Sequence, residues 1–343
     1  MIAYKNAKSV QIFTFHKESY CILMQIIADF NITSYFYQNY YSHYRILKAS
    51  IGSAKNTVMK RILVPTDFSA CADNAVNFAI QSAKFLPAKI LLVHAFELNG
   101  DVYTDYMGVN KEYNESQLRE ATEKLAQLKI SVENKEAVVL DTMVFTGGVK
   151  ESILHLENEK DIELVVMGIN GASGFMQKIW GSKTAAVIDK TTVPVIAVPV
   201  EYQWKKPEKI LLATNHFETD TEILDIIFEL AESFTAKVQI VVFTNEASDT
   251  ALTYLEYTRK IPSYREWLKE KYKDETIVIV HLFGINFEHA LESFISQNEI
   301  DLLAMVTYKR SFTDKIFHPG ITKRMSYHTK IPLLAIPAKQ NQV

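Results

Sequence analysis

The sequence predicts an α/β protein built from two tandem doubly wound domains. Two observations carry this prediction: an internal repeat, and a regular alternation of apolar strands with helices. Three segments recur in the same order, 62–67 as 210–215, 163–167 as 301–305, and 193–199 as 331–337. The last two pairs share one offset of 138 residues. Ordered similarity at a nearly constant offset indicates a duplicated domain.

The first copy opens with a strand and a helix. Residues 62–64 are continuously apolar, as expected of a strand covered on both faces of a sheet. In the helix expected at 72–85, alanines and a valine recur at helical spacing, and Pro87 is expected to stop it. A second apolar strand is expected at 90–93.

The rest of the first copy continues the alternation. A polar helix at 114–128 has apolar residues at helical spacing, and the pair Gly147-Gly148 introduces a later helix. The other expected elements are a strand at 138–145, a helix at 149–158, a strand at 164–167, a helix at 182–189 and a strand at 195–200. Five strands separated by helices indicate a five-stranded parallel sheet with helices on both faces.

Length and composition agree with a globular protein of two domains. The chain has 343 residues, 37 Lys and Arg against 40 Asp and Glu, and two cysteines. This balance does not favour a nucleic-acid-coating protein, and two cysteines do not make a disulfide framework. No apolar run is long enough to span a bilayer. We therefore expect a cytoplasmic protein divided into 59–200, a linker at 201–207, and 208–343.

Residues 1–58 differ from the rest of the chain. They hold seven of the 17 tyrosines, no proline, and a formal charge of +4. Neither the strand period nor the helix period is sustained in them. One hypothesis is that Met59 is the natural start and that this extension is non-native or misannotated. The alternative is an aromatic arm for interactions.

A glycine-rich loop follows the fourth strand. It contains Gly168, Gly171 and Gly174, and Gly181-Ser182 then opens a helix. Glycines let a ligand approach the backbone, and exposed N–H groups at such a loop bind anions. The pattern is neither a Walker loop nor a dinucleotide fingerprint. It indicates a polyphosphate site, and the alternative is a turn needed only for packing.

These motifs together resemble the universal stress protein family. They are 64–69 (VPTDFS), 92–95 (LVHA), the spacing Gly168-x2-Gly171-x9-Gly181-Ser182, and 193–195 (VPV). The chain from residue 59 onward looks like a tandem member with the ATP-binding motif in its first domain. The resemblance implies a Rossmann-like fold of the adenine nucleotide alpha hydrolase-like type. It also implies a non-catalytic, ATP-binding role in stress response, with Mg²⁺ accompanying the ATP.

The resemblance also implies roles for individual residues. Asp67 would accept hydrogen bonds from the nucleoside, beside a wall formed by Pro65 and Thr66, and the backbone of Ala95 would face the adenine edge. Met167 and Gly168 would lie along the nucleoside and phosphates. The residues expected to hold the phosphates are Gly171, Gly181, Ser182, Lys183 and Thr184. An apolar residue is frequent at the position of Lys183.

The second copy lacks the glycine loop. At the offset of 138 residues Gly168 corresponds to Val306, and Gly171 and Gly181 correspond to a lysine and a proline; at the first-strand offset of 148 residues Asp67 corresponds to Asn215. We therefore expect no equivalent ATP site there. Residues 306–330 are basic instead, which indicates either an anion or partner site or a solvated helix face.

The sequence contains no other convincing chemistry. The histidines show no metal-ligand spacing, Cys71 has no evident base, and no acid–base pair is placed for hydrolysis. We expect no enzyme, or at most a weak ATPase. Two alternatives stay open, a nucleotide-independent interaction protein with a vestigial loop and a slow ATP hydrolase.

Expected partners are an adenine nucleotide and an unidentified protein, but neither nucleic acid nor membrane. The resemblance implies that the last strands of the two copies pair antiparallel within one chain, as an intramolecular pseudo-dimer, and a homodimer is possible.

Overall fold

The structure is a computed structural model that describes residues 60–86, 88–97, 109–136, 138–159, 161–169, 182–308 and 330–338. The hypotheses about residues 1–58 concern a part of the chain outside these ranges. So does most of the basic segment 306–330.

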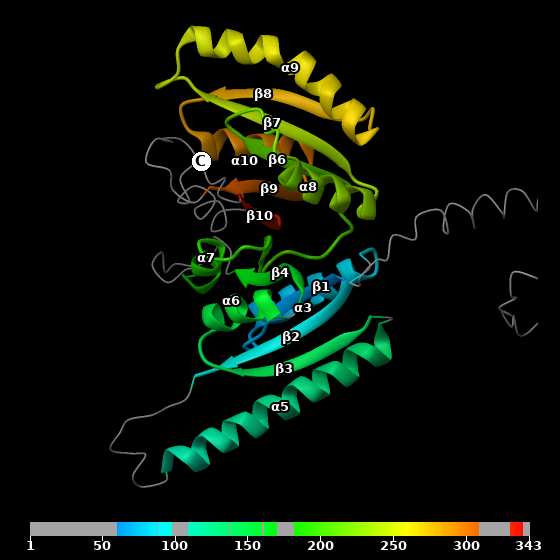
Figure 1. The fold of residues 1–343 in the computed structure, drawn as a ribbon, viewed down its shortest axis with the longest axis vertical. Coiled ribbons are helices and arrows are strands. Elements are labelled where there is room, and N and C mark those ends of the chain that lie inside the picture. The colour runs from blue at the N-terminus through cyan, green and yellow to red at the C-terminus, as the bar shows by residue number, and fades with distance from the viewer. Residues whose placement is uncertain are drawn as a thin grey trace, which may run out of the picture. The chain divides into compact units, whose positions relative to one another are not determined.

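The described chain is organised around one sheet of ten strands (Figure 1). Its order is β3-β2-β1-β4-β5-β10-β9-β6-β7-β8. The first five strands are β1 (Lys60–Pro65), β2 (Ala88–Phe96), β3 (Leu140–Thr146), β4 (Ile162–Ile169) and β5 (Val195–Pro199). The last five are β6 (Lys209–Thr214), β7 (Lys237–Asn245), β8 (Val278–Gly284), β9 (Leu302–Thr307) and β10 (Leu333–Pro337).

The two halves of the sheet have the same strand order. All pairings within each half are parallel, and β5 and β10 join the halves by antiparallel pairing. In this pairing Leu334 lies opposite Ile196. The antiparallel contact expected between the last strand of each copy is therefore present, and β3 and β8 form the two outer edges.

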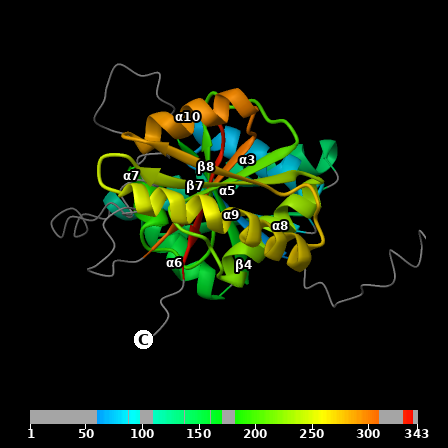
Figure 2. The ribbon, with the colours of Figure 1, turned by 90° about the horizontal axis from the view of Figure 1, so that it is seen from above.

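Helices cover both faces of the sheet. They are α3 (Ala70–Ala83), α5 (Val109–Lys135), α6 (Val149–Glu159), α7 (Ser182–Ile188), α8 (Thr221–Phe234), α9 (Ala251–Tyr272) and α10 (Phe287–Asn298). Residues of α3, α5, α8 and α9 share one apolar core, whereas α6 and α7 pack in a second and α10 in a third. Seen from above, helices lie on either side of the strands (Figure 2). The α/β fold with a parallel sheet is thus confirmed.

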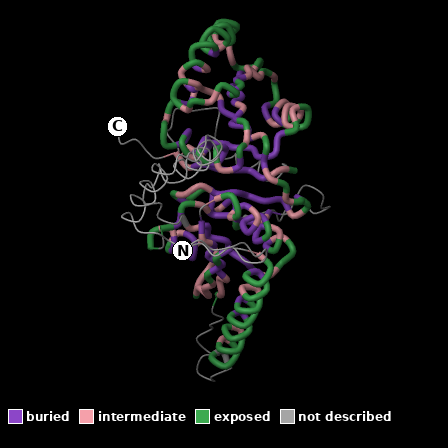
Figure 3. The backbone as a smooth tube through the Cα atoms, turned by 90° about the vertical axis from the view of Figure 1, so that its right-hand side faces the viewer, coloured by how far each residue is buried: buried purple, intermediate pink, exposed green. Residues whose placement is uncertain are grey.

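Buried strands and capped helices explain these elements. All five residues of β5 and all six of β9 are buried, which accounts for their continuous apolar sequence. Buried segments run through the middle of the molecule, between helices with exposed residues (Figure 3). Helix α3 starts at Ala70 because the Ser69 side chain accepts a hydrogen bond from the amide of Ala72. It ends at Ala83, two residues before the expected end. Within the described ranges no helix is long and apolar enough to cross a membrane.

Candidate nucleotide site

A cavity of about 480 Å³ opens at the carboxyl ends of β1 and β4. These neighbouring strands are where the strand order of the first half reverses, the usual ligand position in such sheets. The lining residues come from the ends of β1, β4 and β5 and from the starts of α3, α6 and α7. They are Pro65, Thr66, Asp67, Ser69, Ala70, Cys71, Ala72, Val149, Met167, Gly168, Ile169, Lys183, Thr184 and Val200.

The wall after β1 is held by local hydrogen bonds. The Thr66 hydroxyl accepts from the amide of Phe68 (3.1 Å), and an Asp67 carboxylate oxygen accepts from the amide of Ser69 (3.2 Å). Phe68 adopts the left-handed region, with φ of 59°. These contacts turn the chain sharply from β1 into α3 and leave the Asp67 side chain exposed at the cavity.

Asp67 is held as a carboxylate. Its partial burial opposes ionisation, but hydrogen bonds from Ser69 and the positive charge of Lys183 outweigh burial and lower the pKa of Asp67. An ionised carboxylate only accepts hydrogen bonds, so it suits donors such as hydroxyl groups.

Gly168 lies where β4 passes close to the start of α3. A Cβ atom there would overlap the carbonyl oxygen of Cys71 and lie 2.7 Å from the Cys71 sulfur. Glycine is thus required by packing, whatever occupies the cavity. Packing is therefore a sufficient reason for this one glycine, and the polyphosphate interpretation of the loop stays a prediction.

Thr184 fastens α7 to β4. It is 3% exposed, and its hydroxyl donates to the carbonyl oxygen of Gly168 (3.1 Å). Its proton is therefore not available to a phosphate, although the oxygen can still accept. Lys183, one residue earlier, is exposed and lines the cavity.

Seven of the eleven residues expected at the site line this cavity: Pro65, Thr66, Asp67, Met167, Gly168, Lys183 and Thr184. Gly171 and Gly181 lie outside the described residues. Ser182 begins α7. Ala95 is not among the lining residues; it lies on β2 opposite Phe145. Its neighbour His94 is structural, because its Nδ1 lies 2.8 Å from the Thr66 carbonyl oxygen and its ring stacks on Phe68.

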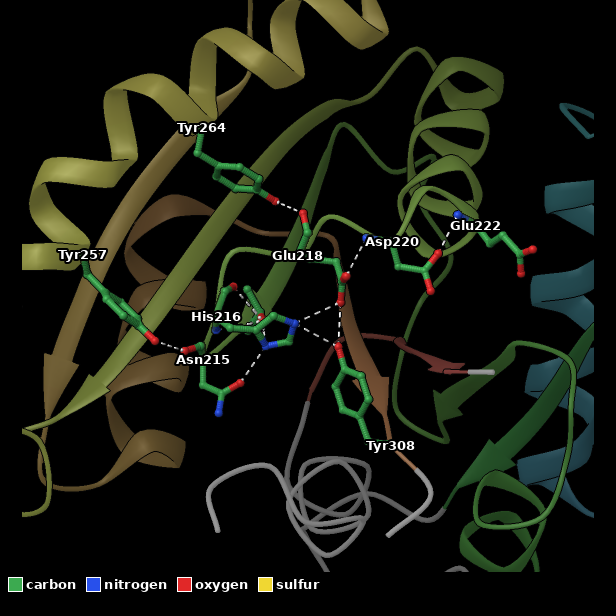
Figure 4. Close-up of polar contacts among 9 residues, drawn as sticks. Asn215, His216, Glu218, Asp220, Glu222, Tyr257, Tyr264 and Tyr308 are labelled. Carbon is green, nitrogen blue, oxygen red and sulfur yellow. Dashed lines mark hydrogen bonds and ion pairs between the residues drawn. The ribbon is translucent and has the colours of Figure 1, made fainter. Parts of the chain in front are cut away.

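A different arrangement occupies the corresponding edge of the second half (Figure 4). Glu218, 4% exposed, accepts a hydrogen bond from the Tyr308 hydroxyl (2.6 Å), and His216 Nε2 lies 3.3 Å from the same oxygen. The Tyr264 hydroxyl donates to the Glu218 carbonyl oxygen (2.6 Å), and the Tyr257 hydroxyl to that of Asn215 (2.9 Å). Side-chain hydrogen bonds thus stabilise the loop that follows β6.

Glu218 carries a buried negative charge in this loop. Burial opposes ionisation, but hydrogen bonds from His216, Tyr308 and the amide of Asp220 lower the pKa of Glu218 to about 2. An ionised carboxylate at this edge repels a phosphate group. No cluster of three or more His, Cys, Asp or Glu residues suited to a metal occurs in the part of the chain that the structure describes.

Residues 59–199 match the sequence model of the universal stress protein family. Over 166 residues the chain is 28% identical to universal stress protein MJ0531 of Methanocaldococcus jannaschii, an alignment that covers 48% of this chain and 93% of that protein. Identity to universal stress protein MJ0577 of the same organism is 29% over 158 residues, covering 42% of this chain and 96% of that protein.

Solved structures extend the likeness of fold beyond the matched region. A universal stress protein from Archaeoglobus fulgidus covers 81% of this chain and 98% of its own, with a TM-score of 0.62 and 14% identity. One from Pseudomonas aeruginosa covers 82% of this chain and 94% of its own, with a TM-score of 0.51 and 12% identity. At such identities the likeness concerns the fold alone.

Several lining residues were not among those expected at the site. For Ser69 the sequence does hold a signal, because serine before an alanine-rich helix is a typical helix cap. Val149 and Val200 reach the cavity only through the folding of distant elements. Cys71 lines it too, but burial and the Asp67 carboxylate raise the pKa of its thiol to about 11, which leaves it protonated and unreactive at neutral pH.

Proposed function

We propose that this chain is a tandem universal stress protein that binds ATP in its first domain and acts as a non-catalytic regulatory module in stress response. The observation that carries the proposal is the cavity at the reversal of strand order, with Asp67 and Lys183 in its wall. Of the residues that carry the resemblance to the family, Pro65, Thr66, Asp67, Ser69 and Gly168 line this cavity. ATP would bind there together with Mg²⁺, and the phosphates of ATP would supply most of the ligands of that ion.

The domain division deepens this proposal. Residues 59–200 would form the nucleotide-binding domain, 201–207 the linker, and 208–343 a degenerate copy, joined as an intramolecular pseudo-dimer. The identical strand order of the two halves and the antiparallel β5–β10 pairing support this division. In the second copy Asn215 stands in the place of Asp67, and the Glu218 carboxylate would oppose phosphate binding.

A non-catalytic role fits the chemistry of the cavity wall. Its titratable residues among those described are Asp67, Cys71 and Lys183. Asp67 has a lowered pKa and Cys71 a raised one, so neither is tuned as a base near neutral pH. Release of phosphate from ATP by the full chain should stay at background; turnover at an ordinary enzymatic rate would favour a hydrolase.

A matched pair of tryptophan substitutions tests the site. Ala70 is exposed, lines the cavity and opens α3 after the Ser69 cap. Ala251 is exposed and opens α9 after the Thr250 cap, on the other half of the sheet. We expect Ala70→Trp to abolish the heat of ATP binding in calorimetry of the full chain, while Ala251→Trp leaves it unchanged. Equal heats in both variants would refute this site.

A further inference from the structure

The cavity wall carries two charged side chains, and they have opposite signs. Asp67 follows β1 and Lys183 is the second residue of α7, so distant parts of the chain supply them. The other described lining residues are uncharged. Lys183 is therefore the cation that a negatively charged ligand meets among these residues.

The ammonium group of Lys183 is available to a ligand. Among the described residues no carboxylate lies within ion-pair distance of it, whereas the nearby Lys190 pairs with Asp189 (3.2 Å). The attraction between Lys183 and Asp67 shows that the two charges are near each other without forming a contact pair.

The backbone that carries Lys183 is fixed. The next residue, Thr184, bonds to β4, and Ala185 and Val187 are fully buried behind it. Of Lys183 itself, the side chain remains to be ordered when a ligand binds. A preorganised backbone lowers the entropy cost of recognising a charged group.

We propose that Lys183 is a specificity residue that makes this cavity favour nucleotides with more phosphate charge over the uncharged nucleoside. The inference rests on the proposed nucleotide function. The physical reason is charge balance: Asp67 alone would give the cavity a net negative charge that repels phosphate, and Lys183 cancels it. Since Lys183 is exposed, the effect should also weaken as salt screens the charges.

The test measures affinity for ATP, ADP, AMP and adenosine by calorimetry on the full chain, at low and high salt. For Lys183→Met we expect ATP to bind about tenfold more weakly, AMP to lose less, and adenosine to be unaffected. Lys183→Glu should weaken ATP further. Lys190→Met, which removes a nearby exposed lysine that is not a lining residue, should match the wild type.

The outcomes separate this inference from the function on which it rests. If the wild type binds ATP and Lys183→Met binds it equally well, the role of Lys183 is overturned and the nucleotide site stands. An equal loss for all four ligands also overturns it, because a charge-selective residue cannot act on adenosine. A wild-type chain that binds none of the four overturns the proposed function and this inference with it. Thermal melting of each variant confirms that it is folded.

Discussion

Gly168 serves packing first. Its lack of a side chain lets β4 approach the backbone of Cys71, and its carbonyl oxygen then accepts the hydrogen bond from Thr184. Gly168 thereby contacts both α3, which Ser69 caps, and α7, which carries Lys183 at the cavity.

The close approach gives a stability prediction. Gly168→Ala should lower the free energy of unfolding by about 1–3 kcal/mol, because the new methyl group overlaps backbone atoms that cannot rotate away. Gly284→Ala is the control, since a Cβ atom there would meet its nearest neighbour, the Ala290 Cβ, at an ordinary 3.7 Å. Urea denaturation measures both. Equal stability of the two variants would show that the contact is not tight.

Glu218 gives a pH prediction. Its pKa is about 2 in the folded chain against an ordinary 4.5, so below pH 4.5 the unfolded chain binds more protons. The stabilisation is complete above pH 4.5 and is lost as the pH falls toward 2. Glu218→Gln should cost about 2 kcal/mol at pH 7 and progressively less in acid. A cost independent of pH between 7 and 3, by urea denaturation, would contradict the ionised state.

At the scale of elements, the sequence predicts the alternation well and the ends poorly. Helix α5 spans Val109–Lys135 instead of 114–128. Val132, four residues after Leu128, is buried in the core, so the apolar spacing continues past the expected end, although Ile130 beside it is exposed. In these last turns Lys129 pairs with Glu133 at helical spacing (3.2 Å).

The candidate site could be predicted in part. The resemblance placed Pro65, Thr66, Asp67 and Met167 there, and they line the cavity because they stand at the carboxyl ends of β1 and β4. The resemblance also placed Ala95 there, and Ala95 is not among the lining residues. The hydrogen bond from the Thr184 hydroxyl to β4 could not be predicted, since it depends on how α7 packs against that strand.

Helix α3 also fastens the chain that leaves β5. The side-chain amide of Asn74 donates to the carbonyl oxygens of Pro199 (2.7 Å) and Tyr202 (2.9 Å). It also lies 3.4 Å from the carbonyl oxygen of Val200. Asn74→Ala removes the amide donor that these carbonyl groups share and should cost about 1–2 kcal/mol, although the Pro199 carbonyl keeps the amide of Tyr202 (3.0 Å).

Hydrogen exchange provides a local readout for Asn74→Ala, with faster exchange expected in residues 200–206. Asn158→Ala is the control, because Asn158 bonds only within its own helix, to the Leu154 carbonyl. Unchanged exchange in residues 200–206 would mean that other contacts hold this segment.

At the scale of the molecule, the ten strands form one sheet, and the carboxyl ends of the strands are arranged differently in its two halves. In the first half the carboxyl edge opens into a cavity, and in the second half Glu218, His216 and Tyr308 are bonded across it. The resemblance to the family, together with the internal repeat, predicts this pairing of halves, and the loss of glycines predicts that the two edges differ. The polar network that replaces the site could not be foreseen, because Tyr308 and Glu218 are 90 residues apart in the chain.

The number of ATP molecules bound per chain decides whether the first half of the sheet alone binds nucleotide. Equilibrium dialysis of wild type, with Ala70→Trp alongside, provides the measurement. We expect one ATP per chain in the wild type and none in Ala70→Trp. Two ATP molecules per chain, or one that persists in Ala70→Trp, would contradict this expectation.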